Sequence, residues 1–123
     1  MDNDRELISV VVPVYNEARV IDEFHARLAV ALEAVDCDTE IIYVDDGSDD
    51  ATVASILDMR ARDNSVALIE LSRNFGKEVA LSAGLDHANG DAVVVIDADL
   101  QDDPGEIPKF LEKLEEGFDV VSG

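Results

Sequence analysis

The chain has only one cysteine, Cys37, and it falls in a predicted loop with acidic neighbours. A single cysteine cannot form a disulfide bond within the chain, so we expect a reducing compartment such as the cytoplasm. The first residues are polar and acidic, unlike a secretory signal peptide. The longest apolar runs, 10–14 and 92–96, fall far short of the ~20 residues of a membrane-spanning helix. We therefore expect no membrane span in this sequence, and these short runs suit buried strands.

Positive charge is also scarce. Nine Lys and Arg stand against 29 Asp and Glu, for a formal net charge of −20. Binding to nucleic acid or to an anionic membrane requires clustered basic residues, so both are excluded as partners. The acidity fits either cation binding by many carboxylates or a solvated, salt-adapted surface of a halophile-like kind. Most acids are spread singly along predicted helices, which favours the second explanation.

Three common nucleotide and hydrolase motifs are missing. No G-x-G-x-x-G follows the first predicted strand, which argues against a dinucleotide oxidoreductase. The sequence contains neither a P-loop nor a G-x-S-x-G nucleophile elbow. Any enzyme built on this chain must therefore use a different site.

What the sequence does contain is a regular alternation of short apolar runs and amphipathic segments. With 47% hydrophobic residues, it can form a core. This pattern predicts an α/β fold with a mostly parallel sheet covered by helices on both faces, in one domain over residues 1–123. The predicted strands are 7–14, 39–44, 66–71, 92–96 and one beginning at 119, and the predicted helices are 18–35, 51–63, 77–88 and 106–116.

The carboxyl ends of the first four predicted strands all carry polar, charged or glycine residues. In open parallel sheets ligands bind at this edge, near a switch in strand order. We therefore expect the chemistry of the protein in four segments, 13–17, 45–48, 72–77 and 97–101.

The strongest candidate is Asp97-Ala98-Asp99, which follows the most apolar strand. In extended backbone, residues i and i+2 point the same way, so the two carboxylates would converge. A divalent cation such as Mg²⁺ or Mn²⁺ would relieve their repulsion, and Gln101 could add a carbonyl oxygen. The alternative is a loop of solvated or helix-capping acids.

The other strand ends offer groups for a nucleotide. Asp45 and Asp46 could accept hydrogen bonds from a base or ribose, while the alternative is an acidic turn in which Ser48, Asp49 or Asp50 caps the next helix. One of the two, Asp45 or Asp46, is expected to be structural. Tyr15 could stack on a base and Glu17 could bond a ribose, unless Asn16 simply caps a helix with Glu17 in its first turn.

Arg73 and Lys77 place scarce positive charge at the third strand end, where a diphosphate would need it. The alternative is pairing with the abundant acids nearby. His25 and His87 fall within or at the end of predicted helices, and we interpret them as surface or core residues, not as ligands or bases.

Together these segments resemble family 2 glycosyltransferases of the GT-A fold. Four strings carry the resemblance in order and spacing, over about residues 7–123: VVPVYNE, IIYVDDGSDD, LSRNFGKEVALSAGLDHANGD and VVVIDADLQDDP. They are most similar to the branch that transfers a sugar to a polyprenyl phosphate, which includes dolichyl-phosphate mannosyltransferases and bactoprenol glucosyltransferases. The resemblance implies the Rossmann-like, nucleotide-binding half of that fold.

The resemblance also implies roles for individual residues. Metal binding on the donor diphosphate falls to Asp97, Asp99 and Gln101, with Asp97 and Asp99 as the catalytic pair. Donor contacts are implied for Pro13, Tyr15, Glu17, Asp45, Asp46, Arg73, Lys77, Asp97 and Ala98.

The implied reaction is inverting, metal-dependent transfer from a nucleotide-diphosphate sugar of the UDP or GDP type to a dolichyl or undecaprenyl phosphate. Family members continue well beyond residue 123, with acceptor-binding residues and often membrane helices, so the chain is expected to be the donor-binding part of a longer protein at the cytoplasmic face of a membrane. Three alternatives remain: a family 2 enzyme with a hydroxyl acceptor, a sugar nucleotidyltransferase and a non-catalytic binding module with an acidic pocket. The nucleotidyltransferase would require a glycine-rich, Arg-containing loop after the first strand, and PVYNEAR is not one.

Overall fold

The computed structural model describes residues 6–35, 37–98 and the backbone of 120–122. Its core is a five-stranded sheet in the order β3-β2-β1-β4-β5, with every neighbouring pair parallel. The strands are β1 (Leu7–Val14), β2 (Asp38–Asp45), β3 (Val66–Glu70), β4 (Ala92–Val95) and β5 (Val120–Ser122).

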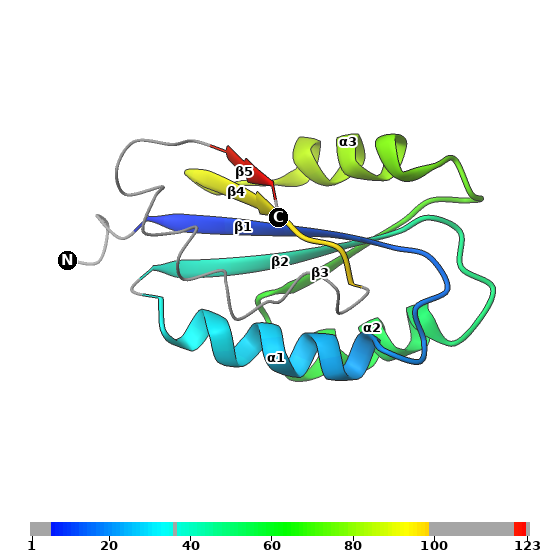
Figure 1. Cartoon of the computed structure of the whole chain (residues 1–123), viewed down its shortest axis with the longest axis horizontal. Coiled ribbons are helices and arrows are strands. Elements are labelled where there is room, and N and C mark those ends of the chain that lie inside the picture. The colour runs from blue at the N-terminus through cyan, green and yellow to red at the C-terminus, as the bar shows by residue number, and fades with distance from the viewer. Residues whose placement is uncertain (1–5, 36, 99–119, 123) are drawn as a thin grey trace.

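Within the described residues, three helices cover the two faces of this sheet. The helices α1 (Ile21–Glu33) and α2 (Thr52–Arg62) lie together on one face, and α3 (Lys77–His87) lies on the other (Figure 1). The α/β class, the parallel sheet and the two covered faces agree with the sequence-based prediction. None of these helices is long and apolar enough to cross a bilayer, within the described part of the chain.

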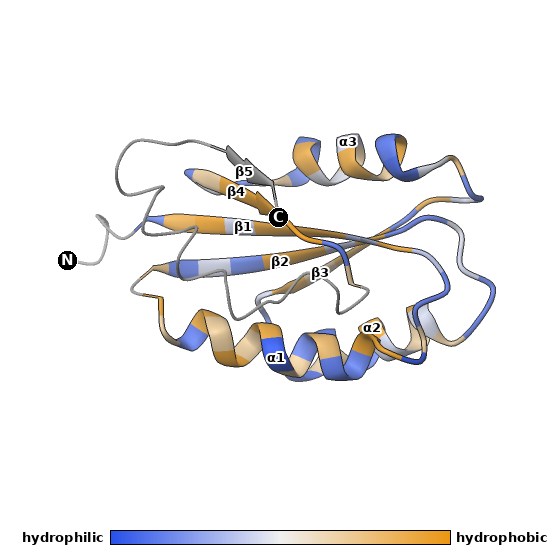
Figure 2. Cartoon of the chain, viewed as in Figure 1, coloured by the Kyte–Doolittle hydropathy of each residue, from blue (hydrophilic) through white to orange (hydrophobic). Residues whose placement is uncertain are grey.

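β1 and β4 are almost continuously apolar because both of their faces are covered, whereas the helix ribbons mix polar and apolar residues (Figure 2). Even-numbered residues of β1 pack against Phe24, Leu28 and Ile56 of α1 and α2. Val11, between them, packs on the other side against Ala80 of α3. The two-residue period of a strand thus decides which helix layer each side chain meets.

α3 lies unusually close to the sheet at Gly84. A Cβ atom built there would lie 2.4 Å from Cγ1 of Val11 and 3.0 Å from Cγ2 of Val44. Glycine at this position therefore allows the helix backbone to approach β1 and β2. The close approach also brings the first residue of α3, Lys77, to the carboxyl edge of the sheet.

Element boundaries differ from the prediction mainly at the first helix, which begins at Ile21 and ends at Glu33 instead of covering 18–35. Asn16 is not its N-cap. Asn16 has a left-handed backbone (φ 51°), and its side-chain oxygen accepts the amide of Asp49, 3.0 Å away. The predicted helix at 106–116 lies outside the described residues.

Candidate functional site

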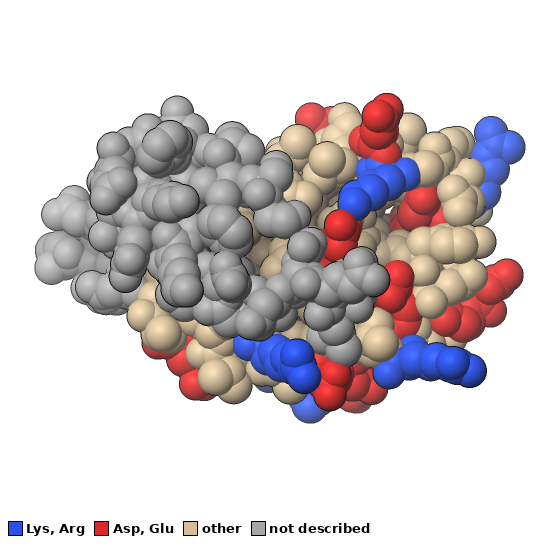
Figure 3. All heavy atoms as spheres, viewed as in Figure 1, with Lys and Arg blue, Asp and Glu red and all other residues tan. Residues whose placement is uncertain are grey.

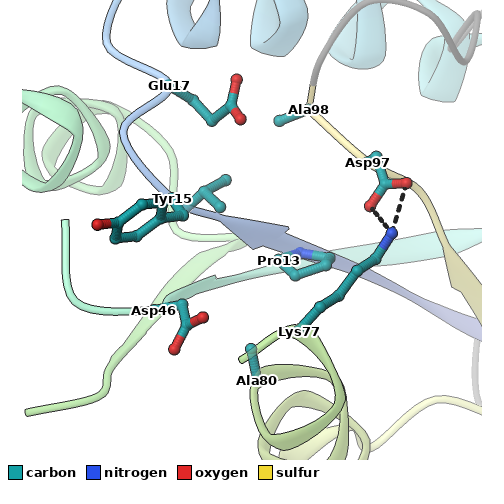
Figure 4. Close-up of a pocket in the computed structure, with 9 residues that line it drawn as sticks. Pro13, Tyr15, Glu17, Asp46, Lys77, Ala80, Asp97 and Ala98 are labelled. Carbon is teal, nitrogen blue, oxygen red and sulfur yellow. Dashed lines mark hydrogen bonds and ion pairs between the residues drawn. The ribbon is translucent and has the colours of Figure 1, made fainter. Parts of the chain in front are cut away.

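The carboxyl ends of β1, β2 and β4 surround a pocket of about 220 Å³, closed on one side by the start of α3. The pocket lies at the switch in strand order, where β1 is paired with β2 on one side and β4 on the other. Its lining consists of Pro13, Val14, Tyr15, Glu17, Asp46, Lys77, Ala80, Asp97 and Ala98 (Figure 4).

Seven of these lining residues are among those predicted from the strand ends and from the family resemblance, namely Pro13, Tyr15, Glu17, Asp46, Lys77, Asp97 and Ala98. Val14 lies in the predicted segment 13–17 but was not singled out, and Ala80 was not predicted. Ala80 lies one turn after Lys77 on α3, so its spacing of three residues from a predicted binding residue could have indicated the position.

Strand periodicity explains how Asp97 reaches this pocket. Val93 and Val95 pack toward α3, and Val94 and Ile96 pack toward α1 and α2. Continuing this alternation places Asp97 on the α3 side of the sheet and buried Ala98 on the other. There the two oxygens of Asp97 lie 2.7 and 2.8 Å from Nζ of Lys77 (Figure 4).

The same alternation separates Asp45 from Asp46. Asp46 lies on the α3 side, where its two oxygens accept the backbone amides of Phe75 at 2.8 Å and Gly76 at 3.1 Å. These bonds hold the turn that precedes α3, so Asp46 both lines the pocket and positions Lys77.

Asp45 does not line the pocket. It is 3% exposed, and its Oδ2 accepts the amide of Ser48 at 3.0 Å, so it shapes the turn after β2. Its buried Oδ1 has no hydrogen-bond partner among the described residues. A buried acceptor without a partner costs free energy.

Two glycines allow the turn after β2 and the turn before α3. Gly47 has φ +83°, and a Cβ there would lie 2.5 Å from the carbonyl carbon of Arg73. Gly76 has φ +101° and ψ 158°, a conformation that is essentially reserved for glycine. The loop after β2 and the loop after β3 therefore pack backbone against backbone beside the pocket.

Arg73 does not line the pocket. Its guanidinium lies 4.9 Å from the ring centroid of Phe75, a cation–π contact between two neighbours in the loop. The two histidines also lie elsewhere: Nδ1 of His25 bonds the buried hydroxyl of Tyr43 at 2.7 Å, and Nδ1 of His87 lies 3.0 Å from the carbonyl oxygen of Ala83.

The loop that carries Tyr15 and Glu17 is held by residues that sequence reasoning did not single out as a site. Four hydrogen bonds connect residues 16–18 with residues 48–52, and we call this set of bonds the clasp. Its bonds run from Asn16 N to Ser48 Oγ (2.8 Å), Glu17 N to Thr52 Oγ1 (2.9 Å), Ala18 N to Asp50 Oδ2 (3.2 Å) and Asp49 N to Asn16 Oδ1 (3.0 Å).

Thr52 is the buried centre of the clasp. Its side chain is 0% exposed, and its hydroxyl also donates to Asp50, which lowers the pKa of that carboxyl. The clasp thus fixes the backbone on which two of the pocket side chains stand.

Predicted metal ligands are only partly within the described residues. Asp97 faces the pocket, whereas Asp99 and Gln101 lie outside the described residues. No three His, Cys, Asp or Glu side chains gather as a metal site in residues 6–35 and 37–98.

On the described part of the face in Figure 3, acidic and basic side chains are interspersed.

The comparisons with known proteins agree with this geometry. The pattern of the family described as "Glycosyl transferase family 2" matches residues 9–123. The chain belongs to this family.

Individual relatives and solved structures are also similar to this chain. The chain is 46% identical to a bactoprenol glucosyl transferase of Shigella phage SfV over 114 residues, which is 93% of this chain and 37% of that protein. It is 31% identical, with a TM-score of 0.69, to mannosyltransferase PcManGT from Pyrobaculum calidifontis in complex with GDP-Man and Mn²⁺, covering 79% of this chain and 28% of the other.

A second solved structure is glucosyl-3-phosphoglycerate synthase from Mycobacterium tuberculosis in complex with Mn²⁺, UDP and glucosyl-3-phosphoglycerate. That likeness has 29% identity and a TM-score of 0.65, and covers 89% of this chain and 39% of the other. The chain spans little more than a third of the length of the curated relatives that it matches.

Proposed function

We propose that this chain binds the nucleotide-diphosphate sugar of a glycosyltransferase, and that the whole protein transfers the sugar to a polyprenyl phosphate. The observation that carries the proposal is the pocket, in which seven residues from four separate segments meet at one sheet edge. Parallel α/β sheets bind nucleotides at this position.

Within the pocket, each part of the donor has chemically suitable groups. Tyr15 is 43% exposed and presents a ring for base stacking. Glu17 and Asp46 offer acceptors for ribose hydroxyls or base N–H groups. The diphosphate would lie toward Lys77 and the start of α3, where the helix dipole favours negative charge. Two solved structures similar to this chain contain GDP-Man or UDP, so either base type is compatible with the fold.

A divalent cation fits the chemistry of the site. Asp97 supplies a carboxylate that is 30% exposed in the pocket, and oxygen ligands are those that Mg²⁺ and Mn²⁺ prefer. Asp97, Asp99 and Gln101 are the proposed ligands. Both similar structures contain Mn²⁺, which supports a divalent ion without choosing between the two. When bound, such an ion neutralises the charge that develops on the leaving diphosphate.

The proposed acceptor is a polyprenyl phosphate, with inversion at the anomeric carbon and with the reaction at the cytoplasmic face of a membrane. The bactoprenol glucosyl transferase at 46% identity supports this acceptor over a hydroxyl acceptor. A phosphate acceptor is already anionic, so it requires little help from a general base. Acceptor binding belongs to the whole protein.

Ligand binding by the chain tests the donor part directly. We expect UDP, GDP or CDP to raise the melting temperature in high salt only when Mn²⁺ is present, since a ligand that binds the folded state stabilises it. Asp97→Asn and Asp99→Ala should abolish the shift. Asp58→Asn, which removes the same charge from an exposed pair with Arg62, should retain it. Absence of any shift with the whole panel would show that the chain binds none of these nucleotides and would refute the proposed donor site.

Intrinsic fluorescence gives a second, independent measure. The chain has no tryptophan and two tyrosines, the exposed Tyr15 in the pocket and the fully buried Tyr43. Nucleotide binding should quench the Tyr15 emission and leave that of Tyr43. In Tyr15→Phe, no nucleotide-dependent quenching should remain. Quenching that persists in this variant would place the nucleotide away from the pocket.

A further inference from the structure

Lys77 and Asp97 come from different layers of the fold and meet across the pocket. Lys77 is the first residue of α3, and Asp97 follows the end of β4 (Figure 4). The ammonium nitrogen lies 2.7 Å from Oδ1 and 2.8 Å from Oδ2, so it engages both oxygens of the carboxylate. An ammonium in this position occupies both carboxylate oxygens and would repel a divalent ion bound to Asp97, so the two cations compete for the carboxylate.

The charge balance of the pocket makes this competition matter. Three carboxylates line the described pocket, at Glu17, Asp46 and Asp97, and Lys77 is the basic residue among the described lining. Asp46 is held by two backbone amides. A diphosphate entering the pocket adds further negative charge and requires a cation from the protein. That cation is the one that Asp97 already holds.

The ion pair between Lys77 and Asp97 can separate at little cost in stability. Lys77 is 61% exposed and Asp97 30% exposed, and ion pairs at exposed positions contribute little to stability. The lysine ammonium sits on a flexible four-carbon stem and can bond in several directions. The backbone from which it extends is fixed, because Asp46 accepts both amides of the turn before α3. The side chain can therefore move while its anchor stays in place.

We propose that Lys77 exchanges partners, holding Asp97 until a divalent cation takes the carboxylate and then turning its ammonium to the donor diphosphate. This inference rests on the donor site proposed above and adds a coupling between its two ligands. Metal binding releases Lys77 for the nucleotide, and the nucleotide in turn stabilises the released lysine. By linkage each ligand raises the affinity for the other.

Removal of the Lys77 ammonium should change the affinity for Mn²⁺ and the affinity for nucleotide in opposite directions. In Lys77→Met, Mn²⁺ without nucleotide should bind about 3- to 5-fold more tightly, because its competitor at Asp97 is absent. UDP or GDP at saturating Mn²⁺ should bind about tenfold more weakly, because a charge-assisted bond to phosphate is lost. Free Mn²⁺ is measured by electron paramagnetic resonance, and nucleotide affinity by the Tyr15 fluorescence.

Two further variants make the result specific. Arg62→Met removes one positive charge from an exposed ion pair with Asp58 on α2, and it should change neither affinity by more than about twofold. Lys77→Arg keeps the charge and offers a planar fork that binds carboxylates more firmly. It should weaken Mn²⁺ binding, the opposite of the effect of Lys77→Met.

The outcomes separate the two proposals. If the wild-type chain binds Mn²⁺ and nucleotide, and Lys77→Met changes the two affinities in opposite directions, partner exchange is supported. If either affinity in Lys77→Met matches that of Arg62→Met, or if Lys77→Arg tightens Mn²⁺ binding, the exchange is wrong while the donor site stands. If the wild-type chain binds neither probe, the donor site itself is refuted and the exchange with it.

Discussion

The hydroxyl of Thr52 accepts the backbone amide of Glu17 at 2.9 Å, which ties the start of α2 to the loop after β1. The two residues are 35 positions apart, and the bond is partly buried. Because Glu17 lines the pocket and Thr52 does not, the bond transmits the position of α2 to the pocket that we propose as the donor site. Thr52 acts here as a positioning residue.

Thr52→Val tests this role. Valine matches threonine in shape but removes the acceptor for the amide of Glu17, so we expect a loss of about 1–3 kcal/mol in the free energy of unfolding. Nucleotide binding with Mn²⁺ should also weaken, because the loop is no longer held. Urea unfolding and nucleotide titration measure the two effects. Thr52→Ser, which keeps the hydroxyl, should restore most of the nucleotide affinity, and failure of this rescue would contradict a role through the hydrogen bond.

Gly47 and Gly76 form a matched pair for a test of backbone geometry. Both have positive φ, at +83° and +101°, but a Cβ at Gly47 would overlap the backbone of residues 73 and 74, whereas a Cβ at Gly76 has nothing within 4 Å. Gly76→Ala should cost about 1–3 kcal/mol from conformational strain alone. Gly47→Ala should cost more, because the loop after β3 must also move. Equal losses in urea unfolding would show that the packing of the two loops does not matter.

Most of the sheet and most of the pocket could be predicted because both depend on local patterns. Short, nearly continuous apolar runs indicate the strands, and parallel strands bring the residues at their carboxyl ends, such as Pro13, Asp46 and Asp97, to one edge. The two-residue period of a strand also explains why Asp46 and not Asp45 faces the pocket, but this requires knowing which helix layer covers which face. Sequence reasoning therefore left the choice between the two open.

Contacts between distant segments could not be predicted in this way. The first helix begins at Ile21 and not at residue 18 because the amides of residues 16–18 bond the 48–52 turn instead of continuing a helix. The pairing of Lys77 with Asp97 depends on how closely α3 approaches β1, which Gly84 permits. The sequence indicates only that a lysine can pair with a nearby acid, and it does not identify Asp97 as the partner of Lys77.

Gly84→Ala tests the close approach of α3. Alanine favours a helix over glycine by about 1 kcal/mol. Here, however, its Cβ would lie 2.4 Å from Cγ1 of Val11, a stiff side chain in a fully buried strand. Overpacking of this kind costs about 1–3 kcal/mol, so we expect a net loss of stability. In a double-mutant cycle, Val11→Ala should relieve the overlap and make the double variant more stable than the sum of the single losses predicts. Additive losses in urea unfolding would contradict the packing argument.

Half-buried His25, which bonds the buried hydroxyl of Tyr43, should make stability depend on pH. Burial is the main cause that lowers the pKa of His25 below 6.5, helped by Arg62 and opposed by Asp63 and Asp22. The folded state therefore binds fewer protons at this residue than the unfolded state does. The contribution of His25 to the free energy of unfolding is fully present above pH 6.5 and is lost as the pH falls below 6.5 toward the folded-state pKa.

Urea unfolding of the wild type and of His25→Asn between pH 7.5 and pH 5 measures this effect. Asparagine can still accept a hydrogen bond from the hydroxyl of Tyr43, a residue that is 0% exposed, but it does not titrate. The wild type should lose more stability than the variant over this range, while the carboxylates that both chains share contribute equally to the two curves. Parallel curves would mean that His25 has the same pKa in the folded and unfolded states. A wild type that gains stability relative to the variant as the pH falls would mean that Asp63 and Asp22 outweigh burial.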